Sequence, residues 1–323
     1  MKYRVFGGTG WEISEIGYGM WGMVDWTGST KEQSERSLDL AVELGCNFFD
    51  TAWVYGTGKS EKLLRDLLRR HRSKKLYTAT KVPPKNFKWP SKSHFRLDEC
   101  FPPEHITEYI HKSLKNLGLE TIDLLQFHVW EDGWASDERW QNPIDKLKRE
   151  GKIRAVGISL NRWEPHNSLE TIKTGLIDAV QVIYNIFDQA PEDELFPLCE
   201  KVGIGIIARV PFDEGTLTGE ITKNTKFPKD DWRSTYFVPE NLHSSAEHAD
   251  RLRPIVPDGM SMADMALRFI LSNGTVSTTI PGMSKEEHVR SNIATSDGSG
   301  LPQSLLDELR KHRWDRKATA WSQ

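Results

Sequence analysis

The sequence predicts a (β/α)₈ barrel formed by one domain. From Ile16 onward, eight short apolar segments with the length of strands alternate with helical segments, some of them preceded by a loop. Short buried strands that alternate with helices indicate a parallel sheet, and eight such units favour a closed barrel. No linker-like stretch, low-complexity tract or repeat divides the chain, so we assign residues 1–323 to a single domain. An open, doubly wound sheet is the alternative.

A short β-hairpin is expected before the barrel, because residues 3–6 and 11–13 flank the turn-rich segment 7–10. The strands are expected at residues 16–22, 46–50, 75–82, 122–128, 153–159, 179–184, 205–208 and 276–280. The helices are expected at residues 30–44, 60–71, 104–117, 142–150, 165–174, 193–202, 246–253, 261–272, 285–294 and 302–313, so the barrel carries extra helices near the C-terminus. Thr30 and Gln33 have the spacing of a capping box. The segment 211–243 is too long for an ordinary connection, which predicts a lid or a binding loop.

Composition argues against several classes of partner. The chain has 43 basic and 46 acidic residues, and its formal charge of −3 at pH 7 offers no overall field for nucleic acid or a membrane surface. Cys46, Cys100 and Cys199 are far apart and form no CxxC pair, so neither a disulfide framework nor a zinc site is expected. The N-terminus lacks the apolar core of a signal peptide, and no apolar run reaches membrane-spanning length. We therefore expect a cytoplasmic protein without a metal.

Three glycines of the first strand, Gly17, Gly19 and Gly22, match the GxGxxG spacing of a dinucleotide-binding turn. That turn requires a helix directly after it, whereas residues 23–29 have the composition of a loop. A Rossmann-type site is therefore not expected here.

Four polar side chains lie at or just after the ends of three neighbouring strands: Asp50 and Tyr55 after the second, Lys81 in the third and His128 at the end of the fourth. In a barrel these strand ends converge on one face. Taken singly, each residue is more readily explained as a loop cap, a solvated lysine or a structural histidine.

Together the four side chains predict a proton donor to a carbonyl group. A phenol with its ordinary pKa of about 10 is a poor donor at neutral pH, and a nearby ammonium lowers that pKa. Asp50 would keep Lys81 charged and oriented, while His128 would hydrogen-bond the substrate oxygen or share the proton. The set contains neither a nucleophile–base pair nor a cluster of metal ligands, so acyl transfer and metal catalysis are not expected. An acid acting on a carbonyl then needs an external reductant, which points to a nicotinamide.

A phosphate site is expected where the eighth strand meets the following helix. Residues 278–285 run from this strand through a glycine to a helix N-terminus, whose free N–H groups favour an anion. Ser284, Lys285 and His288 would add side-chain donors, although an ordinary capped helix uses the same chemistry.

The chain resembles the aldo-keto reductase family at motifs that span nearly its whole length. Residues 49–56 (FDTAWVYG) are similar to the family's FDTAxxYG motif, residues 80–81 to its catalytic lysine strand and residues 124–128 to its histidine strand. Further similarity lies at residues 156–159, 181–185 and 280–292. The resemblance implies a (β/α)₈ barrel that binds NADPH without a Rossmann domain and reduces aldehydes or ketones to alcohols. It also implies that Tyr55 donates the proton, that Lys81 and Asp50 tune its pKa, and that His128 orients the carbonyl.

The resemblance extends to the cofactor contacts, with NADPH expected and NADH as the alternative. The residues expected to contact the cofactor are Gly19, Met20, Trp21, Asp50, Ser159, Asn161, Gln181, Arg209, Val210, Pro211, Phe212, Gly282, Ser284, Lys285, His288 and Asn292.

Three of these positions depart from the family pattern. Leu160 follows Ser159, and Asn161 comes one residue later than the family's Asn or Glu, so the contact with the carboxamide remains open. Arg209 stands where a tyrosine or tryptophan usually stacks on the nicotinamide, and we expect its guanidinium plane to stack there instead. His288 stands where an arginine often binds the 2′-phosphate.

Aromatic residues from loops are expected to line the substrate pocket, namely Trp21, Trp53, Phe87, Trp89 and Trp130, unless they pack against the barrel rim. The expected partner is a small carbonyl compound, and a monomer is consistent with the sequence. Two other functions would share these residues. One is a non-catalytic cofactor sensor that docks a larger protein, and the other is an NAD-linked sugar or alcohol dehydrogenase working oxidatively.

Overall fold

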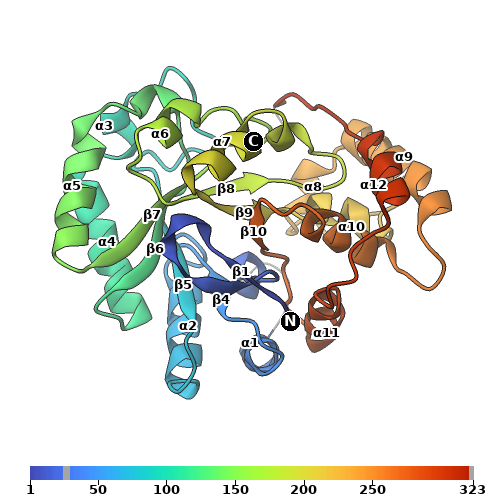
Figure 1. Ribbon diagram of the computed structural model, residues 1–323, viewed down its shortest axis with the longest axis horizontal. Helices are drawn as coiled ribbons and strands as arrows, with labels where there is room; N and C mark the ends of the chain where they lie inside the picture. Colours follow the sequence, from blue (N-terminus) through green and yellow to red (C-terminus); the bar gives the residue numbers. More distant parts are fainter. Residues whose placement is uncertain (25–29, 320–323) are drawn as a thin grey trace.

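The computed structural model describes residues 1–24 and 30–319, and within them it confirms the predicted barrel (Figure 1). Eight parallel strands follow one another around the sheet in sequence order. They are β3 (Tyr18–Gly19), β4 (Phe48–Asp50), β5 (Tyr77–Val82), β6 (Ile122–Phe127), β7 (Ile153–Ser159), β8 (Ala179–Ile183), β9 (Gly205–Arg209) and β10 (Val276–Thr279). Most of the expected loop 23–29 and the end of the C-terminal tail, residues 320–323, lie outside the described residues.

The glycines of the first strand close the barrel. Gly17 donates its N–H to the Thr279 carbonyl at 2.8 Å, and Gly19 forms a parallel bridge with Gly282. A Cβ atom on Gly19 would lie 2.5 Å from the Ile280 carbonyl oxygen, so a larger residue would force the two strands apart. Strand β3 leads into a short 3₁₀ turn, η2 (Trp21–Met23), and not into an α-helix, which agrees with the rejection of a dinucleotide turn.

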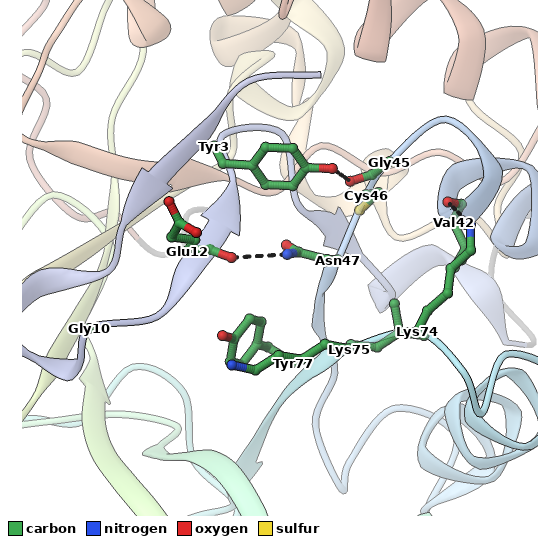
Figure 2. Close-up of a pocket in the computed structure, with 11 residues that line it drawn as sticks. Tyr3, Gly10, Glu12, Val42, Gly45, Cys46, Asn47, Lys74, Lys75 and Tyr77 are labelled. Carbon is green, nitrogen blue, oxygen red and sulfur yellow. Dashed lines mark hydrogen bonds between the residues drawn. The ribbon is translucent and has the colours of Figure 1, made fainter.

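The predicted hairpin closes the bottom of the barrel. Strands β1 (Tyr3–Val5) and β2 (Glu12–Ser14) pair in antiparallel register, and the buried side chains of Phe6 and Ile13 pack on Phe48 at the start of β4. Figure 2 shows the hollow of about 450 Å³ beside this hairpin. Its polar groups bond to one another: Asn47 donates its Nδ2 to the Glu12 carbonyl at 3.0 Å. The hairpin therefore covers one end of the barrel. The opposite end is not covered by it.

The helices that follow the strands form the outer ring (Figure 1). They are α1 (Lys31–Glu43), α2 (Lys59–Arg70), α4 (Pro103–Leu117), α5 (Glu138–Arg149), α6 (Leu169–Lys173), α7 (Leu195–Val202), α10 (Met262–Leu271) and α11 (Glu286–Ala294). Thr30 caps α1, because its hydroxyl accepts the N–H of Gln33 at 3.2 Å, which is one half of the predicted capping box. In α2 the leucines with helical spacing, such as Leu64 and Leu67, are fully buried against the barrel.

Four further helices lie outside this ring: α3 (Leu97–Cys100), α8 (Arg233–Tyr236), α9 (Pro239–Leu252) and α12 (Gln303–Arg310). Helix α9 begins seven residues before the expected range 246–253, and its additional turns bury Leu242 and Ser245. Helix α5 begins at Glu138 and not near residue 142, because Asp137 accepts the N–H of Arg139 at 2.9 Å and Trp140 is buried. None of the helices in residues 1–24 and 30–319 is both long enough and apolar enough to cross a membrane.

Candidate active site

A cleft of about 1110 Å³ opens at the carboxyl ends of the barrel strands. Its floor is made by strand-end residues such as Asp50, Ser159 and Gln181, and its walls come from the loops that follow the strands. This is the end of a barrel at which active sites are built, since the strand ends converge there. The loop 211–243 supplies a large part of one wall, with lining residues at positions 211–215 and 231–236, so the structure places it beside the cleft.

The structure brings the four predicted catalytic side chains together at the floor of this cleft. Lys81 is fully buried and donates its Nζ to Asp50 Oδ1 at 2.5 Å and to the Thr51 carbonyl at 2.8 Å. Its Nζ lies 5.3 Å from the centre of the Tyr55 ring. The rings of Tyr55 and His128 are 5.8 Å apart and inclined by 75°. The phenol therefore lies between a buried ion pair and an imidazole, with the open cleft above it.

Two glutamines hold the second oxygen of Asp50. Gln126 and Gln181 each donate an Nε2 hydrogen to Asp50 Oδ2 at 2.9 Å, and Gln181 also donates to Gln126 Oε1 at 3.3 Å. Each of these bonds to a carboxylate is worth about 1.5–3 kcal/mol. Gln126 was not predicted as a site residue. Its signal was its place as a polar residue near the end of the strand, two positions before His128 and therefore on the same face of the strand.

Burial determines the protonation states of the phenol and the imidazole. Desolvation raises the pKa of Tyr55 above its ordinary value, and the lowering by Lys81 is smaller. The expectation that the ammonium group would lower this pKa therefore needs correction, because burial outweighs the lysine. Burial also holds the pKa of His128 well below its usual range, with Lys81 and Arg209 adding to the effect. At neutral pH Tyr55 carries its proton and His128 is uncharged.

The residues expected to bind the nicotinamide differ in how many of their polar atoms are already hydrogen-bonded within the protein. Ser159 and Gln181 line the cleft next to Asp50. The amide of Asn161 is committed to the protein, since it donates to Glu131 at 3.1 Å and its oxygen accepts the N–H of Ser91 at 3.3 Å. The departure at Leu160 thus diverts Asn161 into a loop network. The Ser159 hydroxyl and the Gln181 carbonyl oxygen are left for the carboxamide, since the Gln181 Nε2 already bonds to Asp50 and Gln126.

Arg209 also lies in the cleft, at the end of β9. Its Nη2 donates to the Leu160 carbonyl at 2.9 Å, while its buried Nε has no hydrogen-bond partner among residues 1–24 and 30–319. Burial lowers its pKa to about 10, with a further contribution from Arg162, so the group stays charged at neutral pH. Within the same described residues the buried Nδ1 of His128 likewise has no partner. Buried polar atoms of this kind fit a cleft that receives a polar ligand.

Most of the residues expected at the phosphate end also line the cleft, including Gly282, Ser284, Lys285 and His288. A Cβ atom on Gly282 would meet nothing within 4 Å, so this edge is open. Lys285 and His288 both approach Glu287, at 3.4 Å and 3.8 Å. Asn292 is 6% exposed in α11 and is not part of the cleft lining, so its contact with a cofactor remains a prediction.

Four of the five expected pocket aromatics line the cleft: Trp21, Trp53, Phe87 and Trp89. Trp89 stands edge-on to His128, with ring centres 5.6 Å apart. The expectation for Trp130 is wrong, because its side chain is fully buried and its Nε1 donates to Thr171 at 2.8 Å. A tryptophan-rich loop segment suggested exposure, but Trp130 packs on Trp140 in the core.

The long loop also brings residues to the cleft that the sequence did not single out. Trp232 contacts Trp21 edge-on, with ring centres 4.9 Å apart, so the long loop packs against the turn that follows β3. Glu214 forms an ion pair with Arg162, which follows β7. Their contact joins segments more than fifty residues apart, which explains why the sequence did not reveal it. In the parts of the chain that the structure describes, no group of three or more His, Cys, Asp or Glu side chains could hold a metal ion.

Comparison with known proteins bears on this geometry. The Aldo/keto reductase family model matches residues 15–313. The chain belongs to this family. As an aldo/keto reductase, it is an NAD(P)H-dependent oxidoreductase that acts on carbonyls or alcohols.

Relatives of this aldo/keto reductase match it over nearly its full length. An uncharacterized oxidoreductase of Bacillus subtilis, YqkF, is 29% identical over 313 residues, which cover 97% of this chain and 96% of the relative. The NADH-specific methylglyoxal reductase of Escherichia coli is 29% identical over 315 residues, covering 91% and 93%. The structure of a glycerol dehydrogenase from Gluconobacter oxydans superimposes with a TM-score of 0.79 at 26% identity, covering 99% and 98%.

Proposed function

We propose that this aldo/keto reductase reduces an aldehyde or ketone with NADPH and that Tyr55 donates the proton to the carbonyl oxygen. The observation that carries the proposal is the buried Lys81–Asp50 pair at 2.5 Å beneath the Tyr55 ring, at the floor of the cleft. Burial makes loss of the Tyr55 proton costly, and the fixed ammonium group of Lys81 offsets part of that cost when the proton passes to an adjacent acceptor.

The roles of the side chains follow from their charges. Tyr55 is protonated at neutral pH, so it can donate without a prior titration. Lys81 and Arg209 are the cations that stabilise the phenolate left behind, while the two amides on Asp50 keep that carboxylate beside the lysine. His128 is neutral and has an unpaired nitrogen, and it would hydrogen-bond and orient the substrate oxygen. A bound nicotinamide supplies the hydride that the carbonyl carbon receives.

The cofactor would lie along the cleft from the catalytic floor to α11. Ser159 and Gln181 would hold the carboxamide, and Arg209 would stack on the ring. Lys285 and His288, at the exposed end, would meet the 2′-phosphate of NADPH. Glu287 partly opposes this contact with the 2′-phosphate, because its carboxylate pairs with both Lys285 and His288. The NADH-specific relative shows that family members can differ in this choice.

Oxidation of an alcohol is the second candidate, and the likeness to a glycerol dehydrogenase favours it. The same side chains would serve, with the phenolate of Tyr55 accepting the alcohol proton. This direction predicts higher turnover with NAD⁺ or NADP⁺ and polyols than with NADPH and the corresponding carbonyls.

Steady-state assays distinguish these functions. Purified protein is assayed with NADPH and NADH against a panel of aliphatic, aromatic and dicarbonyl aldehydes and ketones, and with NAD⁺ and NADP⁺ against alcohols and polyols. The proposal expects the highest kcat/KM for a carbonyl with NADPH. Tight cofactor binding without turnover of any carbonyl or alcohol would indicate the sensor function and contradict the proposal.

A further inference from the structure

The C-terminal tail places one arginine inside the fold. After α12 the tail runs back toward α7 (Figure 1). Along this path Trp314 stacks on His248 of α9, with ring centres 3.8 Å apart. Two residues later the Arg316 side chain is only 4% exposed. Its Nη2 donates to Asp188 at 2.5 Å and to Asp213 at 2.7 Å. A buried cation shared by two carboxylates is held firmly in place, because breaking either bond leaves a buried charge unpaired.

Both carboxylates connect to the turn that follows β9. This turn, residues 210–214, has three non-glycine residues in the left-handed region, with φ of 56° at Val210, 46° at Asp213 and 57° at Glu214. Left-handed backbone is unfavourable for residues with a Cβ, and most of all for a β-branched one such as valine. Such a conformation persists only where the surrounding structure holds it.

Arg316 holds the turn at two points. At one end it bonds directly to Asp213, whose neighbour Glu214 forms the ion pair with Arg162 in the cleft. At the other end it acts through Asp188, which accepts a hydrogen from Asn185 Nδ2 at 2.9 Å. The second hydrogen of that amide goes to the Val210 carbonyl at 3.0 Å. The turn thus has its first and fourth residues tied to one tail side chain.

We propose that Arg316 is a positioning residue for cofactor binding. The turn carries Arg209, Val210, Pro211 and Phe212 to the cleft wall, where the cofactor would lie. By holding the turn in its left-handed conformation, Arg316 sets the position of these side chains although it is not part of the cleft lining itself. This inference rests on the proposed function, since it requires a nicotinamide cofactor in the cleft.

The test compares Arg316→Met with Arg313→Met in the full-length protein. Arg313 lies in the same tail but pairs with Asp193 and Asp315, neither of which contacts the turn. The dissociation constant of NADPH is measured by fluorescence titration, without a carbonyl present. We expect Arg316→Met to raise it about tenfold or more and Arg313→Met to leave it within about twofold of the parent. Equal effects of the two variants, or an unchanged dissociation constant in Arg316→Met, would overturn the proposal.

Amide hydrogen exchange in the cofactor-free protein separates positioning from general stability. The N–H groups of Gly215 and Leu217 both donate to the Phe212 carbonyl at 2.9 Å, so they report on the turn. Arg316→Met should speed exchange at these two amides while the barrel strands keep the parent's protection. Exchange that rises equally throughout the barrel would contradict a positioning role.

If Arg316→Met does not fold, Asp213→Asn gives the same test, because it keeps the shape of the side chain and removes one charge of the network. It should also weaken NADPH binding, and an unchanged dissociation constant would again overturn the proposal. Failure of the parent protein to bind NADPH or NADH would instead refute the proposed function, so the two failures are distinguishable.

Discussion

Replacement of Lys81 by methionine tests how the buried ion pair supports the phenol. The variant removes the ammonium group, whose Nζ lies 5.3 Å from the centre of the Tyr55 ring, and keeps a side chain of similar length. Asp50 would remain buried with its two amide donors but without its cation. Two consequences follow, one for the reaction rate and one for stability.

The size of the rate effect can be estimated from that distance. With the developing charge placed at the ring centre, 5.3 Å from the ammonium group, the interaction is about 3 kcal/mol at an effective dielectric constant of about 20. A loss of this size in the transition state lowers kcat roughly 200-fold. Leaving Asp50 unpaired should also reduce the free energy of unfolding by about 3 kcal/mol, at the lower end for a broken buried pair because the glutamines still bond to it.

The assay measures kcat at saturating NADPH and the free energy of unfolding by urea for the parent, Lys81→Met and a double variant. Asp50→Asn combined with Lys81→Met removes the unpaired charge, so this double variant should be more stable than Lys81→Met alone. A kcat of Lys81→Met within about threefold of the parent would refute the electrostatic role. A double variant that is no more stable than the single one would refute the account of the buried pair.

Three further predictions concern the surroundings of the phenol and the cofactor end of the cleft. Gln126→Leu removes one amide donor from the catalytic carboxylate, so kcat should fall about tenfold while the NADPH dissociation constant is unchanged, and an unaltered kcat would count against its role. Glu287→Gln removes the anion beside the exposed cations, so titrations should show NADPH binding tightened by about two- to fivefold and NADH binding unchanged; an equal effect on both would contradict a 2′-phosphate site there. The kcat for reduction should stay level from about pH 6 to about pH 9, because the pKa of Tyr55 is raised and that of His128 is lowered by burial; a titration step near pH 6.5 would show that the histidine is not neutral.

The barrel was predictable because its strands are short, apolar and separated by helices with clear periodicity. Strand β7 has the predicted bounds. Gly19 is explained by the closure of the barrel, because a Cβ atom there would clash with the Ile280 carbonyl. Helix α9 was underestimated because its first turns contain polar and small residues that bury only a few apolar side chains. The predicted start of helix α5 was too late, because Pro143 was placed in its first turn and in fact lies inside it. Both errors come from tertiary packing that outweighs a weak local signal.

The candidate site was predictable to the extent that it lies at strand ends. Parallel strands bring Asp50, Lys81 and His128 to one face whatever the loops do. The sequence could not show that Gln126 bonds to the same carboxylate or that Arg316 reaches the turn after β9, since these contacts depend on the closed barrel and the path of the tail. Trp130 was misplaced because burial of a loop residue is decided by its neighbours.

The role of Tyr55 as proton donor is tested most directly by Tyr55→Phe in single-turnover experiments with NADPH and the best carbonyl of the panel. The account predicts that the rate of cofactor oxidation falls by several orders of magnitude, because the ring and its packing remain but the acid is lost. The NADPH dissociation constant should stay close to that of the parent. A rate close to the parent's would contradict the account and assign the proton to another group.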